Sequence, residues 1–180
     1  MNSEEKNVQL IFVVETTETA KTDTFYIKGV LDEYYNVNNN KITFVYLGGK
    51  YNYKKNRPQN DIKKYIKDYK QFSYGDSYVI YVLDKDKGEK SEDDAKYILE
   101  IEDYCKDNDY EIIWFVRDIE DVFWGYRVTS RRKKEAAYLF SRQLQIKNVE
   151  KRNLSAPNNV NKRPKSNILT ILNEYLETKS

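Results

Sequence analysis

Four short apolar runs, separated by segments of helical periodicity, constrain the fold more than any other feature of this sequence. The runs VQLIFVV, ITFVYL, YVIYVL and YEIIWFV occupy residues 8–14, 42–47, 78–83 and 110–116. Continuous runs of β-branched and aromatic residues are typical of strands that are buried on both faces of a parallel sheet. Between them, apolar residues recur at helical spacing over residues 22–35, 59–72 and 91–106. The alternation predicts an α/β fold with a mostly parallel, four-stranded, Rossmann-like sheet flanked by helices.

The remaining chain differs in character from the four strands and their connecting helices. Residues 117–124 are expected to form a short loop or helix, and residues 130–146 a basic helix. Residues 151–165 contain two prolines and several asparagines, which is typical of an exposed connection, and residues 168–176 predict a closing amphipathic helix. We therefore expect an α/β domain over residues 1–125 and a basic helical extension over residues 126–180, packed on the same domain.

The sequence contains no histidine and only one cysteine, Cys105, among its 180 residues. Without histidine, Ser-His-Asp and Cys-His catalysis and the common zinc sites are excluded, so any chemistry must come from carboxylates, Lys, Arg, Tyr, hydroxyl groups or a hard metal ion. A single cysteine excludes an intramolecular disulfide and suits a reducing compartment. No stretch approaches the roughly 20 apolar residues that span a bilayer. These features predict a cytoplasmic protein with no membrane partner.

The charge of the chain is unevenly distributed. Residues 84–121 contain fifteen acidic and six basic residues, whereas residues 126–165 contain twelve basic and two acidic residues. Such asymmetry indicates a polyanionic partner, with nucleic acid the first candidate, although solvated helix faces would produce the same pattern. The candidate contacts to a phosphate backbone are two basic groups, Arg131, Arg132, Lys133 and Lys134 in the extension and Lys50, Lys54, Lys55 and Arg57 after the second strand.

Acidic residues follow two of the predicted strands. Glu15 ends the first strand, and Asp84 and Asp86 form a D-x-D at the end of the third. Ligands of open parallel sheets bind at the carboxyl ends of the strands, and all-oxygen ligand sets suit Mg²⁺ or Mn²⁺. The alternatives are a turn-capping role for Glu15 and a solvated loop for the D-x-D. Glu120 is a further candidate ligand, the alternative being an acid in the first turn of a helix.

The segments VVETTETAKTDTFYI (13–27), VYLGG (45–49) and VIYVLDKDKGE (79–89) resemble the Toprim domain, and within it the small RloB-like proteins of bacterial restriction and phage-defence loci. Weaker similarity covers EIIWFVRDIEDVFWG (111–125) and SNILTILNEYL (166–176). The resemblance implies a metal-dependent nuclease in bacterial defence or a mobile element. Glu15 would then act in acid–base chemistry or as an additional ligand, and Asp84 and Asp86 would hold Mg²⁺.

One departure from the Toprim pattern bears on activity. Thr16 follows Glu15 where the family usually has glycine, and Ala20 follows Thr19 where the RloB-like form continues toward Thr-Glu. A threonine gives the backbone less freedom to approach a phosphate closely. Two alternatives to a nuclease therefore stay open: a nucleic-acid-binding or sensor protein without turnover, and a subunit of a defence complex that docks an acidic partner protein.

Overall fold

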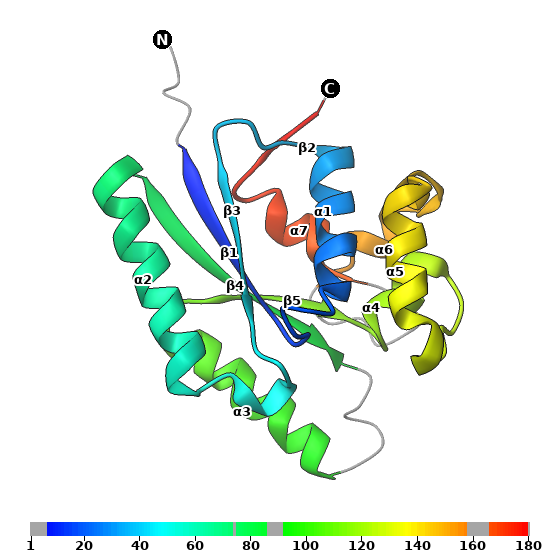
Figure 1. Cartoon of the computed structure of the whole chain (residues 1–180), viewed down its shortest axis with the longest axis horizontal. Coiled ribbons are helices and arrows are strands. Elements are labelled where there is room, and N and C mark those ends of the chain that lie inside the picture. Colours follow the sequence, from blue (N-terminus) through cyan, green and yellow to red (C-terminus); the bar gives the residue numbers. More distant parts are fainter. Residues whose placement is uncertain (1–6, 74, 86–91, 158–165, 180) are drawn as a thin grey trace.

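A four-stranded parallel sheet forms the centre of the molecule (Figure 1). The computed structural model describes residues 7–73, 75–85, 92–157 and 166–179. The strands of the sheet are β1 (Val8–Val14), β3 (Lys41–Tyr46), β4 (Asp76–Asp84) and β5 (Glu111–Phe115). Their order across the sheet is β3-β1-β4-β5, and every neighbouring pair is parallel. The predicted α/β class and the four-stranded parallel sheet are confirmed.

Alternate residues of β1 face two hydrophobic layers. Leu10 and Phe12 point into one layer and Ile11 and Val13 into the other, and all four are fully buried. Side chains of a strand alternate between the two faces of a sheet, and β1 is also paired along both edges, with β3 and β4. Both faces of β1 are therefore buried, which explains why its residues are apolar except for Gln9, whose side chain is hydrogen-bonded to Thr43 and Ser77.

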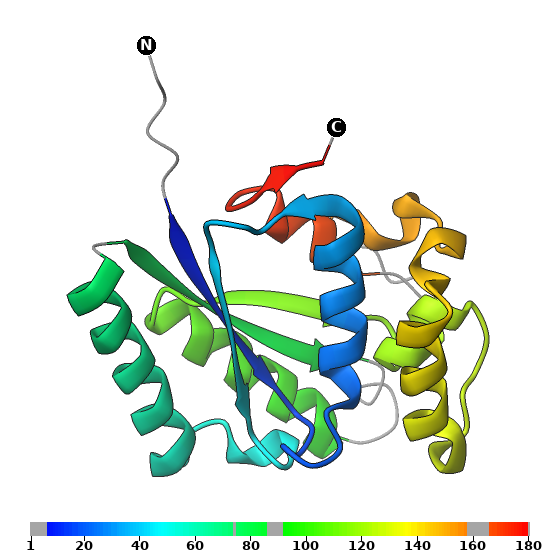
Figure 2. The ribbon, with the colours of Figure 1, turned by 45° about the horizontal axis from the view of Figure 1, so that its top comes forward.

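Helices cover both faces of the sheet (Figure 2). One face is covered by α2 (Asn56–Ser73) and α3 (Glu92–Asp107). The other face is covered by α1 (Thr22–Tyr34), α4 (Ile119–Trp124), α5 (Lys133–Arg142) and α7 (Ile168–Leu172). Within the described residues, none of these helices combines the length and the apolar character that crossing a bilayer requires.

The C-terminal segment covers the open edge of β5. The side-chain amide of Asn167 donates to the Ile112 carbonyl at 2.9 Å, and its oxygen accepts the Trp114 amide at 2.9 Å. Ser166 forms an antiparallel bridge with Phe115. These bonds satisfy backbone groups of β5 as a fifth strand would, and an edge that is paired in this way is protected from pairing with another chain.

The predicted basic helix at residues 130–146 is wrong as a single element. The chain instead forms a 3₁₀ turn, η3 (Ser130–Arg132), then α5, then a second 3₁₀ turn, η4 (Gln145–Asn148). The break follows α5 at Leu144, whose φ of 50° lies in the left-handed region. That conformation is uncommon for a leucine, and the bend directs Ile146 into the core, where it is buried. Tertiary packing therefore decides the break.

The closing segments also differ from expectation. Residues 151–165 are predicted to be an exposed connection, but α6 (Lys151–Leu154) forms there and Leu154 and Ala156 are buried, whereas residues 158–165 lie outside the described part. The helix predicted at residues 168–176 ends at Leu172. Turns take the place of the last helical turn, with the amides of Glu174 and Tyr175 donating to the carbonyls of Ile171 and Leu172 at 3.1 Å. After them the chain forms β6 (Glu177–Thr178), which pairs antiparallel with β2 (Tyr35–Asn36).

The contact between α1 and α5 yields a stability prediction. A Cβ added to Gly29 would lie 2.7 Å from Cε1 of Phe140, a buried ring that also contacts Tyr26 at a centroid distance of 4.7 Å. We expect Gly29→Ala to lower the free energy of unfolding by about 1–3 kcal/mol in urea denaturation, because overpacking outweighs the ~1 kcal/mol helix preference for alanine. Phe140→Leu in the Gly29→Ala background should recover part of the loss. A Gly29→Ala protein as stable as wild type would contradict this close contact.

Candidate functional site

The loops after β1, β4 and β5 meet at the carboxyl edge of the sheet. Because β1 lies beside β4 and β4 beside β5, residues that follow these strands stand at adjacent strand ends. Glu15 follows β1, Asp84 ends β4, and Asp118 precedes α4 after β5. Three carboxylates that are far apart in the sequence are thereby brought to one edge.

The backbone at Glu15 is held by the loop that follows β3. The amides of Leu47, Gly48 and Gly49 donate to the carbonyls of Val14, Thr16 and Glu15 at 2.9, 3.1 and 2.9 Å. Gly48 and Gly49 have φ values of 64° and 142°, which side chains rarely tolerate. The two glycines therefore let the loop turn while it extends the pairing of β1 and β3 beyond the strands, and this fixes the backbone that carries Glu15.

Asp84 lies in a strongly acidic environment. Its carboxylate accepts the Ile119 amide at 3.0 Å, at the start of α4. Burial raises the pKa of Asp84 well above its ordinary value, and the charges of Glu15, Asp23, Asp118 and Glu120 raise it further, Glu15 most strongly among them. Four further carboxylates are therefore close enough to oppose ionisation of Asp84.

Asp23 belongs to this group and was not singled out by its sequence pattern. It lies buried in the first turn of α1, where the Thr22 hydroxyl donates to it at 3.3 Å. Burial raises the pKa of Asp23 to about 7 and Glu120 adds to the increase, although Thr22, Lys133 and the backbone of Thr16 oppose it. The sequence offered one signal for Asp23, namely its position in the first turn of the helix that follows the first strand.

Lys133 supplies a positive charge within the acidic group. Its Nζ lies 2.9 Å from Oδ2 of Asp118 and 3.0 Å from Oε2 of Glu120, and the Glu120 side chain is only 2% exposed. Burial raises the pKa of Glu120, while Lys133 counteracts the increase. Burial also disfavours the charged form of Lys133, but Glu120 and Asp118 outweigh that effect and raise its pKa. Lys133, predicted to contact phosphate, is instead directed towards carboxylates.

The other predicted basic contacts divide into two surfaces. In the extension, Arg131, Arg132 and Lys134 are exposed. On the other side of the sheet edge, Lys50 of η1 (Lys50–Asn52) lies 4.7 Å from the Tyr51 ring, and Lys54 lies 5.1 Å from the Tyr53 ring. Their charges remain near the surface, with the side chains laid over tyrosines.

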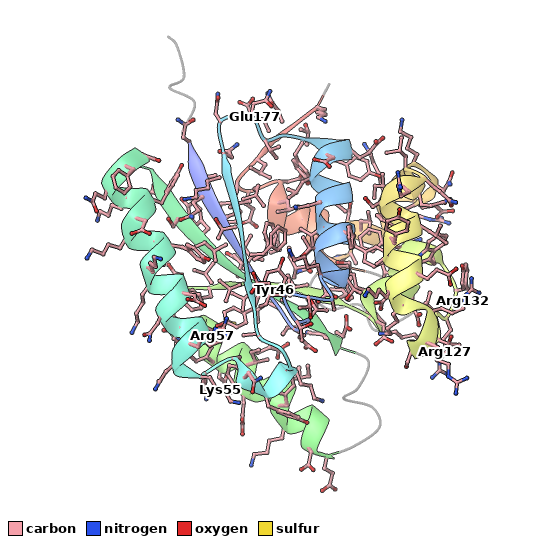
Figure 3. All side chains as sticks on the ribbon, in the orientation of Figure 1. Tyr46, Lys55, Arg57, Arg127, Arg132 and Glu177 are labelled. Atoms are coloured by element: carbon pink, nitrogen blue, oxygen red, sulfur yellow. The ribbon has the colours of Figure 1, made fainter. Side chains whose placement is uncertain are left out.

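A groove of about 620 Å³ follows the free edge of β3, beside the loop after Glu15. Lys55 and Arg57 contribute to it, and so do the acids Glu18 and Asp61. In the view of Figure 3, Lys55 and Arg57 lie on one side of the carboxyl edge of the sheet, and Arg127 and Arg132 on the other. Bases therefore flank the carboxylates on two sides.

Asp121 and Cys105 have structural roles. Asp121, beside Glu120, is buried and accepts the Val128 amide at 2.8 Å, which shapes the loop after α4. Cys105 is buried in α3, and burial raises the pKa of its thiol to about 12, so it is a packing residue. Asp86, the second acid of the D-x-D, lies outside the described residues.

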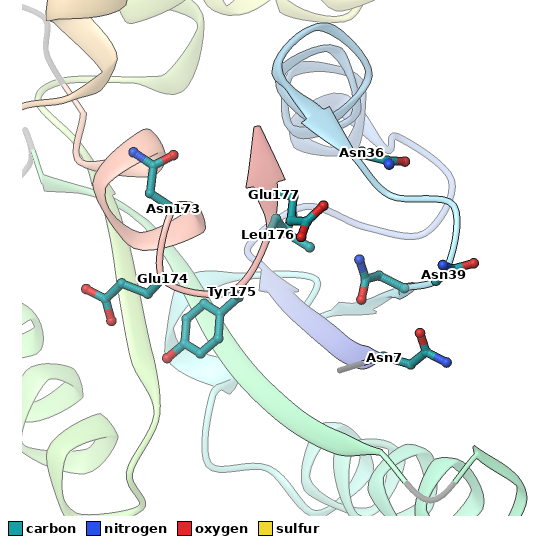
Figure 4. A pocket seen from close by; sticks show the side chains of 9 residues that line it. Asn7, Asn36, Asn39, Asn173, Glu174, Tyr175, Leu176 and Glu177 are labelled. Carbon is teal, nitrogen blue, oxygen red and sulfur yellow. The ribbon is translucent and has the colours of Figure 1, made fainter. Parts of the chain in front are cut away.

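A second pocket lies at the opposite, amino-terminal edge of the sheet (Figure 4). It has a volume of about 320 Å³ and is rich in asparagines. Two of them have structural bonds: Asn40 accepts the Val8 amide at 3.0 Å, and Asn173 accepts the Tyr35 hydroxyl at 2.8 Å. The length of the strands separates this pocket from the carboxylates at the opposite edge, so it is not part of the candidate site.

The donor chemistry of the carboxyl edge fits a hard divalent cation. All the acidic groups offer oxygen ligands, and the buried Thr16 hydroxyl oxygen, next to Glu15, has no hydrogen-bond partner in the described part of the chain. Within the same residues, no three acidic or thiol side chains stand at the spacing of a complete metal site. The described carboxylates therefore supply suitable ligands, and a complete set would need Asp86 or movement of the side chains.

The ion pairs of Lys133 yield a stability prediction. Lys133→Met would leave Glu120 buried without its counter-charge, and we expect a loss of about 3 kcal/mol in urea denaturation, the low end for a broken buried pair because Lys133 is partly exposed. Its exposed neighbour provides the control, since Lys134→Met should change stability by less than about 0.5 kcal/mol. Equal effects of the two substitutions would show that the ion pairs contribute nothing.

The raised pKa of Asp23 yields a pH prediction. The folded protein retains this proton up to about pH 7, whereas the unfolded chain loses it near pH 4, so Asp23 makes the fold progressively less stable as the pH rises between these values. Asp23→Asn should therefore match wild type near pH 4 and be more stable by up to about 4 kcal/mol above pH 7. Thermal and urea unfolding across this range measure the difference. A difference independent of pH would contradict the assignment.

No protein-family model, curated protein or solved structure matches this chain. The parallel sheet and the acidic edge are therefore the observations on which a function must rest. The resemblance to Toprim domains and RloB-like proteins stays a prediction from the sequence.

Proposed function

We propose that the protein is a metal-dependent nuclease that hydrolyses phosphodiester bonds of DNA or RNA. The observation that carries the proposal is the convergence of five carboxylates at the carboxyl edge of the sheet, namely Glu15, Asp23, Asp84, Asp118 and Glu120. Asp23 and Glu120 are buried, and Glu15, Asp84 and Asp118 are half-buried. Repulsion among acids in such an environment costs stability, and folds keep such arrangements chiefly where they serve a function.

Glu15 and Asp84 are the residues that would hold Mg²⁺ or Mn²⁺, together with Asp86 and with Glu120 as a further candidate. A divalent ion in such a site polarises a phosphoryl oxygen and lowers the pKa of bound water. Asp84 is kept in place by the Ile119 amide, and the backbone of Glu15 is held by Gly49. Asp23, with a pKa of about 7, is able to exchange a proton near neutral pH.

The bases on two sides of the acidic edge, all exposed except the half-buried Lys50, would hold the substrate. Arg131, Arg132 and Lys134 lie on the extension, and Lys50, Lys54, Lys55 and Arg57 lie near η1 and the start of α2. Phosphate contacts of this kind position a nucleic acid without reading its sequence. The Toprim and RloB-like resemblance supports the same reaction. It adds to the proposal a role in bacterial defence, alongside a partner protein of the defence system.

A nucleic-acid-binding or sensor protein without turnover is the second candidate. The favouring observation is Lys133, which already provides Asp118 and Glu120 with a positive charge inside the acidic group. An internal cation of this kind lowers the need for a metal ion there. The two candidates share the basic surfaces and differ in whether metal binds and a phosphodiester is cleaved.

Nuclease activity is tested with labelled single-stranded and duplex DNA and RNA in the presence of Mg²⁺ or Mn²⁺. We expect cleavage by the wild type, and Asp84→Asn and Asp86→Asn should each reduce it by more than the roughly 10–100-fold typical of residues that only hydrogen-bond to metal ligands. Asp103→Asn, on the exposed side of α3, is the matched control and should cleave as wild type does. Binding without cleavage supports the second candidate, and absence of both supports docking of an acidic partner protein.

Thermal unfolding in Mn²⁺ provides a readout that does not depend on turnover. At about 100 times the dissociation constant, a bound ion stabilises the fold by about 2.7 kcal/mol and should raise Tm by roughly 5–10 °C. Asp84→Asn should remove this shift, although it relieves repulsion and makes the metal-free protein more stable. A wild-type Tm that does not change when Mn²⁺ is added would contradict the proposed metal site.

A further inference from the structure

A small pocket with aromatic and arginine side chains lies between α4 and α5. Its volume is about 190 Å³, below the roughly 300–1,000 Å³ of sites for drug-sized ligands, which suits a single ring system. Trp124 and Tyr126 form an aromatic wall, and Ala136 and Leu139 of α5 contribute an apolar surface. The pocket has the size and lining for one flat group.

The aromatic wall offers ring faces to a ligand. Tyr126 is 56% exposed, although it is a large aromatic residue, and its ring centroid lies 6.0 Å from that of Trp124 at an angle of 48°. The Trp124 indole N–H donates to the Tyr26 hydroxyl at 3.1 Å, which fixes the orientation of Trp124. A fixed indole beside an exposed phenol is a surface on which a base can stack.

The charged residues of the pocket select an anion. Arg127 and Arg132 contribute to its lining, and among the described residues no acidic side chain does. Arg132 pairs with Glu135 at 3.5 Å, and this pair is well exposed and therefore weak. Figure 3 shows both arginines beside the end of α5 at which the helix begins. Guanidinium groups bind phosphate in a bidentate manner and also stack on bases.

The pocket and the acidic edge share two helices. α4 carries Glu120 in the acidic group and Trp124 at the pocket, four residues or about 6 Å further along the helix. In the same way, Lys133 contacts the acids while the preceding residue, Arg132, lines the pocket. The pocket and the acidic group therefore lie next to each other on α4 and at the start of α5.

We propose that this pocket binds one nucleotide of a single-stranded nucleic acid. The base stacks on Tyr126 and Trp124, and its phosphate contacts Arg127 and Arg132. The adjacent phosphodiester is thereby placed at the acidic edge, a consequence that rests on the proposed nuclease function. Phosphate contacts alone do not distinguish single-stranded from double-stranded nucleic acid. The pocket adds recognition of an unpaired base to them.

The test measures fluorescence anisotropy of labelled single strands of about eight nucleotides, DNA and RNA, in EDTA. Tyr126→Ala and Arg132→Ala should each weaken binding roughly tenfold, as expected for loss of one stacking or charged contact. Each has a matched control on the same part of the surface: Tyr138→Ala, an exposed tyrosine of α5, and Arg142→Ala, an exposed arginine at the end of α5 that does not line the pocket, each of which should change binding by less than about threefold. Tyr126→Phe, which keeps the ring, should bind as wild type does.

Competition distinguishes base from phosphate recognition. Adenosine monophosphate should displace the strand from wild type at lower concentration than either adenosine or inorganic phosphate, and Tyr126→Ala should abolish that advantage. Equal competition by inorganic phosphate, or equal losses in each variant and its control, would overturn the nucleotide pocket and leave a non-specific basic surface. Because the assay contains no metal and reads no cleavage, its outcome is independent of whether Asp84→Asn abolishes turnover.

Discussion

The parallel pairing of β1 with β4 is the constraint on which the candidate site depends. Parallel strands end at the same edge, so this pairing brings the loop after Val14 beside Asp84 although about seventy residues separate them. The pairing of β4 with β5 extends the edge to Asp118 and Glu120. Had β4 lain at an outer position of the sheet, the same acidic residues would have been solvated separately, and their mutual repulsion would have been small.

Electrostatics at this edge connect stability with function. Burial and repulsion favour protonated Asp23 and Asp84 over their charged forms, and Lys133 offsets part of that cost from the first turn of α5. The C-terminal extension, residues 126–180, therefore contributes to the site as well as to the core. Lys133 of this extension contacts the acids directly. Asn167 of the same extension pairs with the backbone of β5, the strand that leads to Asp118 and Glu120.

The sequence alone predicted much of the fold because its strongest signals are local. The runs at residues 8–14 and 78–83 are almost entirely apolar, as is typical of strands buried on both faces, and both are strands in the structure. The buried polar exception, Gln9, is hydrogen-bonded to Thr43 and Ser77 on the neighbouring strands. Asp84 and Glu15 were found because they directly follow such runs. Asp23 and the inward direction of Lys133 were missed, because an acid in the first turn of a helix and a lysine in a basic run look the same whether they face solvent or a buried partner.

The chain's pattern thus determined the α/β class, the four strands and the acidic residues that end them, because these follow from hydrophobic periodicity and from positions next to it. Only the tertiary structure decided which strands are neighbours, where the basic segment bends at Leu144, and which charges meet. Those features depend on contacts between residues far apart in the sequence. Burial changes the free energy of a charged side chain far more than the adjacent residues in the sequence do. A side chain becomes buried only when the helices have packed on the sheet.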